Sequence, residues 1–291
     1  MTTLVTGGTG FVGRFVVEDL LAAGHDVVVC GRTAPAENFF SGPVRFAAGS
    51  LEPDQIDASI FAGVDHLVHA GFDHAPGKYR GGEGDDPDGF VRRNRDGSIA
   101  LFEAAKTAGV RRAVFLSTRA VYGPKPAGVV LTEETPTTPD TLYGQVKLDV
   151  EQAVLAMADR DFMAVTLRIT GVYGPAGPGR QHKWAGLFAD YLSGKTIVAR
   201  AGTEVHGEDV ARAVRLAIDD AEQPQILNVS DTIVDRRDLL GIVKEINGAT
   251  HPLPERADIS TVNAMDCARL KALGWTPGGW PLLEKAVRDL V

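Results

Sequence analysis

The chain has 291 residues, of which 44% are hydrophobic and 23% are charged, and this composition excludes a wholly disordered or fibrous protein. Lys and Arg number 30 against 38 Asp and Glu, a net charge of −8, so the chain lacks the basic surface that a nucleic-acid partner requires. There are only two cysteines, Cys30 and Cys267, and no apolar run approaches the roughly 18 residues that span a bilayer, so we expect a cytoplasmic protein with no membrane span.

Short β-branched runs alternate with segments of helical period in the first part of the chain. Strands are predicted at residues 4–6, 27–30, 44–46, 65–69, 113–116 and 163–167, and helices at 11–23, 98–108 and 142–158. This alternation is typical of a parallel sheet with helices on both faces. The predicted fold class is therefore α/β, a doubly wound parallel sheet of the Rossmann type. A glycine-rich polar stretch at 73–89 is predicted to be a long loop, either a functional lid or disordered.

The regular alternation weakens beyond residue 170. Gly and Pro interrupt the chain at residues 174–179, and further helices are predicted at 210–221, 239–246 and 282–290, with a strand at 226–228. We place a boundary here: residues 1–170 form an NAD(P)-binding Rossmann domain, and residues 171–291 form mainly a smaller C-terminal substrate-binding lobe. The segment of about 205–230 is expected to return to the first domain.

A glycine-rich segment joins the first predicted strand to the first predicted helix. Gly7 allows a tight turn, Gly10 leaves room for a pyrophosphate, and Gly13 lets helix and strand pack closely. The strand before and the helix after make this pattern specific for a dinucleotide site. The residues expected to surround the dinucleotide here are Gly7, Thr9, Gly10, Phe11, Val12 and Gly13.

The second predicted strand ends in Cys30-Gly31-Arg32-Thr33. It lacks the carboxylate that normally binds the adenine ribose of NAD, and Arg32 offers a planar guanidinium suited to the 2′-phosphate of NADP. NADP is the predicted cofactor and NAD is the alternative. An arginine that is simply solvated is the other explanation.

Tyr143 and Lys147 open the predicted helix at 142–158, and their spacing of four places them on one face. Free tyrosine titrates near about 10, so acid–base work at neutral pH needs a stabilised phenolate, which a neighbouring ammonium provides. Such a pair often marks only a solvated helix face. Thr118 ends the fifth predicted strand, the sheet edge where ligands bind, and can hold a substrate oxygen near Tyr143. A hydroxyl bonded to its own backbone is the alternative for Thr118.

Together these segments resemble the extended short-chain dehydrogenase/reductase family, often called the NAD-dependent epimerase/dehydratases. The resemblance covers nearly the whole chain. It is carried by Thr6 to Gly13, His69-Ala70, Asn94, Ser117 to Gly123, Tyr143 to Lys147, Arg168, Tyr173-Gly174-Pro175, Val205 to Val210 and Leu273-Gly274-Trp275.

The resemblance implies roles for the catalytic candidates. Tyr143 would be the general acid and base, Lys147 would hold the nicotinamide ribose and lower the tyrosine pKa, and Thr118 would orient the reacting oxygen. Asn94 would support the active-site backbone or a water relay. Further cofactor contacts are expected from His69, Ala70 and Ile169.

The implied function is that of an NAD(P)-dependent oxidoreductase or epimerase that moves a hydride between nicotinamide and a hydroxyl or carbonyl carbon. The implied assembly is a homodimer formed through the helices at 98–108 and 142–158.

Departures from the family pattern bear on the substrate. Relatives that remove water typically carry Thr-Asp-Glu in this segment, and here Arg119 and Ala120 stand at the two acidic positions, which disfavours a dehydratase. Arg168-Ile169-Thr170-Gly171 lacks the asparagine with which nucleotide-sugar epimerases bind a diphosphate. We expect a small, sugar-derived or anionic substrate, with Arg119, His74 and His182 as candidate contacts and no metal. The alternatives are a nucleotide-sugar epimerase and a non-catalytic dinucleotide-sensing regulator.

Overall fold

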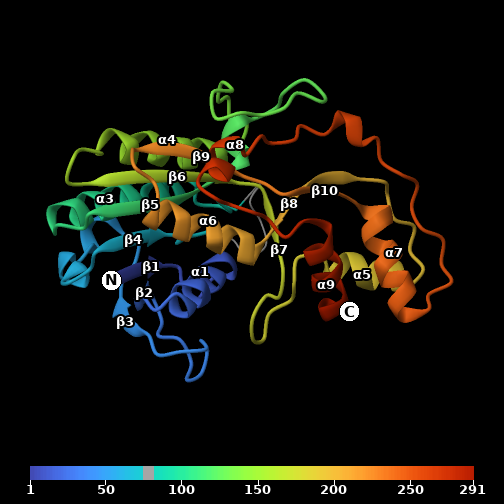
Figure 1. The fold of residues 1–291 in the computed structure, drawn as a ribbon, viewed down its shortest axis with the longest axis horizontal. Helices are drawn as coiled ribbons and strands as arrows, with labels where there is room; N and C mark the ends of the chain where they lie inside the picture. The colour runs from blue at the N-terminus through green and yellow to red at the C-terminus, as the bar shows by residue number, and fades with distance from the viewer. Residues whose placement is uncertain (75–81) are drawn as a thin grey trace.

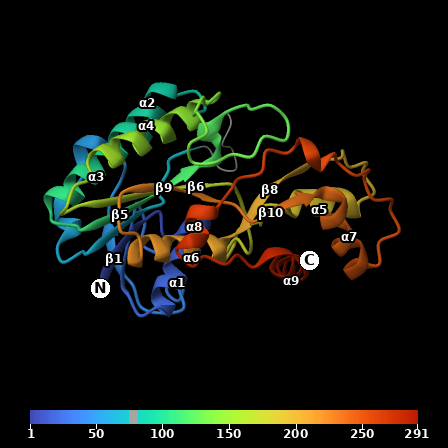
Figure 2. The ribbon, with the colours of Figure 1, turned by 45° about the horizontal axis from the view of Figure 1, so that its top comes forward.

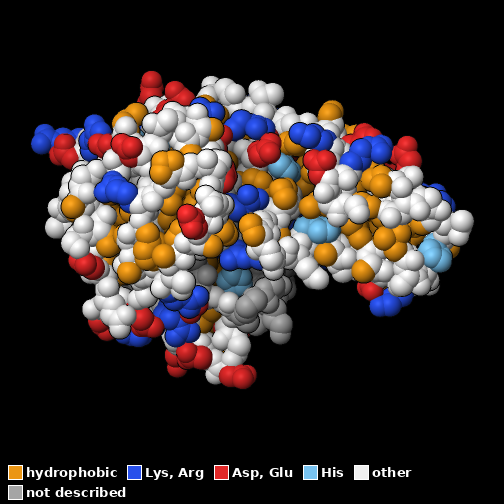
Figure 3. Space-filling view, turned by 90° about the horizontal axis from the view of Figure 1, so that it is seen from below, with side chains coloured by type: hydrophobic (Ala, Val, Ile, Leu, Met, Phe, Trp, Pro, Cys, Tyr) orange, Lys and Arg blue, Asp and Glu red, His pale blue; other side chains and the backbone are white. Residues whose placement is uncertain are grey.

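The computed structural model describes residues 1–74 and 82–291. The part of the predicted loop that covers residues 75–81 lies outside the described residues. No helix within the described ranges is long and apolar enough to reach across a membrane. Basic and acidic side chains are interspersed on the face shown in Figure 3, so that face offers no continuous basic surface.

A seven-stranded parallel sheet forms the centre of the larger lobe (Figure 1). Its strands lie in the order β3-β2-β1-β4-β5-β6-β9, and every neighbouring pair is parallel. This arrangement confirms the predicted fold class. The strand bounds are β1 Thr2–Thr6, β2 Asp26–Gly31, β3 Arg45–Ala48, β4 His66–His69, β5 Arg112–Thr118, β6 Met163–Ile169 and β9 Gln225–Val229.

Helices cover both faces of the sheet, because successive strand side chains point to opposite sides. Val5 faces a core layer with α1 and α6, whereas Leu4 faces the layer with α3 and α4. Figure 2 shows these two helix layers on either side of the strands. The helix bounds are α1 Phe11–Ala22, α3 Gly97–Thr107, α4 Leu142–Ala156 and α6 Gly207–Asp219.

The helix predicted at 98–108 begins earlier than expected. The chain is helical from Pro87, through α2 Pro87–Val91 and a π-helical turn, η3 Arg92–Asp96, into α3. Asp86 caps this run by accepting a hydrogen bond from the Gly89 amide (2.9 Å). The apolar spacing does not predict this segment, because it carries Asp, Gly and Arg rather than a hydrophobic stripe.

A smaller lobe is built around a three-stranded sheet, β10-β8-β7 (Figure 1). None of the three strands of this sheet was predicted from the sequence, because they are short and lack a continuous apolar run. The bounds are β7 Gly171–Tyr173, β8 Ala201–His206, β10 Thr232–Asp235, α5 Ala185–Leu192, α7 Arg236–Asn247, α8 Ala268–Ala272 and α9 Gly279–Leu290. Short 3₁₀ turns are η1 Pro53–Gln55, η2 Ala58–Phe61, η4 Arg119–Tyr122 and η5 Ile259–Thr261.

The chain passes between the lobes more than once, because β9 pairs with β6 in the large sheet while β8 and β10 lie in the small one. Asp209 holds this junction. It is fully buried, its carboxylate accepts a hydrogen bond from the Gly278 amide (3.1 Å), and its carbonyl accepts one from the Trp275 indole (2.9 Å). Burial raises the pKa of Asp209 to about 6. The division of the chain at residue 170 stays a prediction.

Candidate functional site

The loop between β1 and α1 is a cradle made of backbone. Gly7 has a φ of +65°, which favours glycine, and a Cβ on Gly13 would lie 2.1 Å from the Gly7 carbonyl oxygen. The Gly10 amide donates to the same oxygen (2.8 Å), and α1 begins after Gly10 without a side-chain cap. The first amides of α1 therefore remain available to an anion, as the predicted pyrophosphate requires.

A cavity of about 380 Å³ opens above this cradle. Its walls are the carboxyl ends of β2, β3 and β4 together with η3, the position at which parallel sheets bind nucleotides. The residues that line it include Gly7, Thr9, Gly10, Gly31, Arg32, Ser50, Leu51, Phe72, Asp73, Arg93 and Arg180. The cavity and the glycine cradle together fit the adenosine and pyrophosphate parts of a nicotinamide dinucleotide.

Three of the predicted cofactor residues, at the start of α1, are not part of the lining of this cavity. Phe11, Val12 and Gly13 form the first turn of α1, where Phe11 packs edge-on against Phe15 (5.7 Å between ring centroids). They shape the cradle through the backbone.

His69 does not reach the cavity. Its side chain is 0% exposed, and its two ring nitrogens contact the hydroxyls of Thr6 (2.6 Å) and Ser98 (2.8 Å). Desolvation lowers the His69 pKa to about 3. The structure therefore corrects the expectation of a cofactor contact by this side chain, because the imidazole is a satisfied core group that ties β1, β4 and α3 together. Ala70 follows it, half-buried, at the end of β4.

Arg180 is a residue that the sequence reading missed. It lies in the loop after β7, yet its guanidinium donates to the Thr9 carbonyl oxygen (2.9 Å) and lines the dinucleotide cavity. From the opposite side, Arg14 of α1 donates to the carbonyl of Pro175 (3.0 Å). The contact cannot be inferred from local sequence patterns, because Arg180 and Thr9 are 171 positions apart in the chain.

A second cavity, of about 790 Å³, lies between the two lobes. Thr118, Arg119, Tyr143 and Ile169 all line it. The structure thus brings together the catalytic hydroxyls proposed from separate parts of the chain. Ile169 belongs to this cavity rather than to the dinucleotide cavity.

Local packing fixes the approach of Tyr143 to Thr118. Thr141 caps α4 by accepting from the Gly144 amide (3.0 Å), and a Cβ on Gly144 would lie 2.9 Å from the Ala120 carbonyl oxygen. The first turn of α4 can therefore press against η4. The Thr118 hydroxyl accepts from the Ala120 amide (3.2 Å), which orients it at the end of β5.

Lys147 is buried one turn beyond Tyr143. Its side chain is 5% exposed and its ammonium donates to the Leu116 carbonyl (2.7 Å) and lies 4.6 Å from the centre of the Phe72 ring. The same ring packs edge-on against Tyr143 (5.1 Å). Desolvation lowers the Lys147 pKa to about 7, and a group whose pKa is shifted this far is a candidate functional residue.

The substrate side of the second cavity carries several cations. Arg119 donates to the Asn263 carbonyl (3.1 Å), and Arg200 and Arg236 line the far end. A Cβ on Gly171 would lie 2.5 Å from the Lys183 ammonium and 2.7 Å from a carboxylate oxygen of Glu204. Lys183 and Glu204 form an ion pair there, and burial raises the pKa of Glu204.

The two predicted histidine contacts line neither cavity. His74 is exposed and its Nδ1 approaches the Phe72 carbonyl (3.4 Å), while His182 packs against Phe188 (5.2 Å between ring centroids). Both substrate contacts stay predictions from the sequence. Asn94, in contrast, supports the backbone as expected: it bonds both the amide and the carbonyl of Asp73 (2.7 Å each).

Comparisons with known proteins identify the family and several relatives of this chain. The sequence profile of the NAD-dependent epimerase/dehydratase family matches residues 3–230. A dTDP-6-deoxy-L-talose 4-dehydrogenase (NAD(P)(+)) of Kitasatospora kifunensis is 31% identical, over 98% of this chain and 93% of its own length. A UDP-glucose 4-epimerase of Corynebacterium glutamicum is 29% identical, over 95% of this chain and 91% of its own.

A solved structure is similar over the same extent. The complex of Thermus thermophilus UDP-glucose 4-epimerase with NAD superposes with a TM-score of 0.77 at 27% identity, over 100% of this chain and 98% of that one.

Proposed function

We propose, from the premise that this chain belongs to the NAD-dependent epimerase/dehydratase family, that it moves a hydride between a nicotinamide dinucleotide and a hydroxyl-bearing carbon of a small sugar-derived or anionic substrate. The chain is an enzyme of the extended short-chain dehydrogenase type. One observation carries the proposal: Thr118 and Tyr143 line the same cavity, and the ring of Phe72 contacts both Tyr143 and the buried ammonium of Lys147.

Each of these side chains has a distinct task. The bound nicotinamide supplies the hydride chemistry. Tyr143 exchanges the proton of the reacting oxygen, and Thr118 holds that oxygen by a hydrogen bond. The Lys147 ammonium, in low-dielectric surroundings, favours the phenolate form of the tyrosine and offers a donor to the cofactor ribose.

The substrate proposal follows from the far end of the second cavity. Arg200 and Arg236 line it, and among the described residues no carboxylate lies within 4.0 Å of either guanidinium, although the charge of Arg200 still acts on the Glu204 carboxyl. Two such cations favour a carboxylate or phosphate on the substrate. The Lys183–Glu204 pair fills the space that a side chain at Gly171 would need. This favours a substrate other than a nucleotide sugar.

A nucleotide-sugar epimerase is the second candidate. It is favoured by the relatives named UDP-glucose 4-epimerase, which match this chain over nearly its whole length. Gly171 argues against it, because relatives that bind a diphosphate typically have an asparagine at the corresponding position.

The cofactor is of the NAD type, as the family is. We propose that NADP is also bound, through Arg32, whose exposed guanidinium (79% of the side chain) lies at the rim of the dinucleotide cavity. The NAD(P)(+) specificity in the name of the Kitasatospora relative supports this proposal. A homodimer through α3 and α4 and a cytoplasmic location remain predictions from the sequence.

The proposal is tested by incubating the protein with NAD or NADP and a panel of sugars, uronates, sugar phosphates and nucleotide sugars. Nicotinamide absorbance detects oxidation or reduction, and NMR of the recovered sugar detects epimerisation. Activity in the wild type that disappears in Tyr143→Phe is the expected result. If both proteins bind the dinucleotide and both are inert across the panel, the sensing regulator replaces the enzyme.

A further inference from the structure

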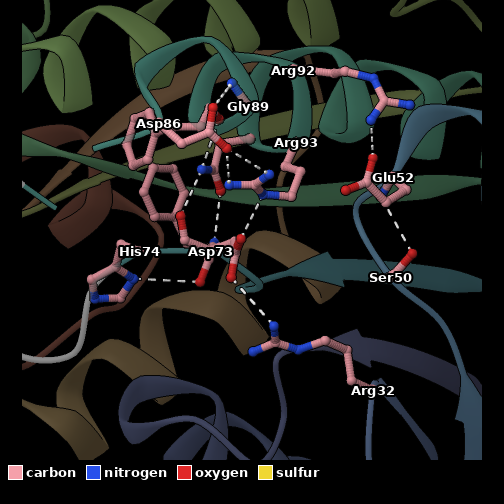
Figure 4. A network of polar contacts seen from close by, with 12 residues as sticks. Arg32, Ser50, Glu52, Asp73, His74, Asp86, Gly89, Arg92 and Arg93 are labelled. Atoms are coloured by element: carbon pink, nitrogen blue, oxygen red, sulfur yellow. Dashed lines mark hydrogen bonds and ion pairs between the residues drawn. The ribbon is translucent and has the colours of Figure 1, made fainter. Parts of the chain in front are cut away.

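A carboxylate occupies the adenosine end of the dinucleotide cavity, although β2 ends without one. Asp73 follows β4 and lines this cavity together with Arg32 and Arg93. Figure 4 shows Asp73 between the two guanidinium groups, with Arg93 reaching it from η3 and Arg32 from the end of β2. Arg93 Nε lies 2.7 Å from Asp73 Oδ2, and Arg32 lies 3.4 Å from Asp73 Oδ1.

The position of Asp73 is fixed by its neighbours. Asn94 is 1% exposed and bonds both the amide and the carbonyl of Asp73 at 2.7 Å. Arg93 in turn contacts Asp86 (3.4 Å), which caps α2. Asn94 therefore fixes the backbone of Asp73, and Arg93 fixes Oδ2 of its carboxylate. The other carboxylate oxygen, Oδ1, has only the longer contact with the largely exposed Arg32.

The charges at this end of the cavity nearly balance. Glu52, Asp57 and Asp73 line the cavity together with Arg32, Arg93 and Arg180, so its lining carries little net positive charge. A 2′-phosphate brings about two negative charges and needs Arg32 freed from Asp73. A ribose 2′-hydroxyl brings no charge and donates a proton, which Oδ1 of Asp73 can accept.

We propose that Asp73 determines the choice between the two dinucleotides in this site. Its carboxylate takes the place of the acid missing from the end of β2: it accepts the ribose hydroxyl of NAD and opposes the 2′-phosphate of NADP by neutralising Arg32. This inference rests on the dinucleotide site of the proposed function. It predicts an enzyme that accepts both cofactors and that becomes selective for NADP when the carboxylate is removed.

The test compares binding of 2′,5′-ADP and of ADP by titration calorimetry, which needs no substrate and no turnover. Asp73→Asn is expected to bind 2′,5′-ADP about tenfold more tightly, which corresponds to about 1.4 kcal/mol, because one opposing charge is removed. The same variant is expected to bind ADP about threefold more weakly, because a neutral amide is a poorer acceptor than a carboxylate. Asp73→Ser, which keeps a small polar group, should shift the ratio in the same direction.

Asp86→Asn is the matched control. It makes the same charge change on the other partner of Arg93, but Asp86 is 62% exposed and does not line the cavity, so the affinity ratio should change less than about twofold. Circular dichroism verifies that each variant is folded. An unchanged ratio in both Asp73 variants, or equal weakening of both ligands, overturns the role of Asp73 while leaving the dinucleotide site intact. If wild type binds neither ligand, the proposed function itself fails.

Discussion

Replacing the buried lysine with methionine should stabilise the protein at low pH while removing its activity. Lys147 is 5% exposed, and its ammonium is surrounded by the rings of Phe72 and Phe115 (4.6 and 4.7 Å from the ring centres). Burial lowers its pKa from 10.5 to about 7. Methionine fills a similar volume without a charge, so Lys147→Met separates the cost of burying the cation from the packing of the side chain.

The magnitude follows from the two pKa values. At 1.36 kcal/mol for each pH unit, lowering the Lys147 pKa from 10.5 to about 7 corresponds to about 5 kcal/mol. The folded state holds this proton less tightly than the unfolded chain. The free energy of unfolding of the wild type therefore rises with pH between about 7 and 10.5, and the full cost is present below that range.

Urea unfolding of the protein without cofactor, at about pH 6, 8 and 10, measures this effect. Lys147→Met should be the more stable protein at the lowest pH, and its advantage should shrink by up to about 5 kcal/mol as the pH rises. Lys106→Met is the control, because the Lys106 side chain is 37% exposed and its replacement removes a lysine without relieving a buried charge. If Lys147→Met is the less stable protein at every pH, by a constant amount, the reasoning from burial is refuted.

Three further changes test other parts of the structure. Gly13→Ala should abolish dinucleotide binding and lower the melting temperature, because the new Cβ would lie 2.1 Å from the Gly7 carbonyl oxygen; unchanged binding in a fluorescence titration would contradict the cradle. Arg180→Met should weaken ADP binding about fivefold without altering the melting temperature, as a charge-assisted contact beside a pyrophosphate implies, and equal affinities by calorimetry would remove Arg180 from the site. Burial raises the Asp209 pKa to about 6, so its carboxyl holds a proton more tightly in the folded protein than in the unfolded chain, and the free energy of unfolding should fall as pH rises from about 4 to about 6. Asp209→Asn should flatten this pH dependence in melting curves recorded at acid pH. An unaltered pH dependence would show that other groups cause it.

The parts of the fold that were predicted correctly depend on local patterns. β1, β2, β5 and β6 are buried runs that contain β-branched residues, and the glycine loop lies between β1 and α1. The shared cavity of Thr118 and Tyr143 also follows from chain order, because Thr118 ends β5 and Tyr143 begins α4, the next long helix, at the carboxyl edge of the sheet.

The parts that were missed depend on contacts between distant segments. Arg180 contacts Thr9 from the loop after β7. Asp73 is held by Asn94, which lies in a helical segment that the spacing of apolar residues does not predict. His69 matches a cofactor-contacting position in the sequence, yet its neighbours Thr6 and Ser98 satisfy both ring nitrogens. Burial of a side chain is a property of the packed layers, and the strand pattern alone does not determine it.

The two arginine contacts that cross from α1 and the glycine loop to the segment after β7 bear on how long a cofactor stays bound. Arg14 donates to the Pro175 carbonyl and Arg180 donates to the Thr9 carbonyl, so the segment after β7 is tied to the edge of the dinucleotide cavity, and we expect these contacts to slow the release of a molecule bound there. Slow exchange suits an epimerase, which regenerates its dinucleotide within each cycle, whereas a dehydrogenase must let the spent form depart every time. The residence time of the dinucleotide therefore distinguishes the two reactions.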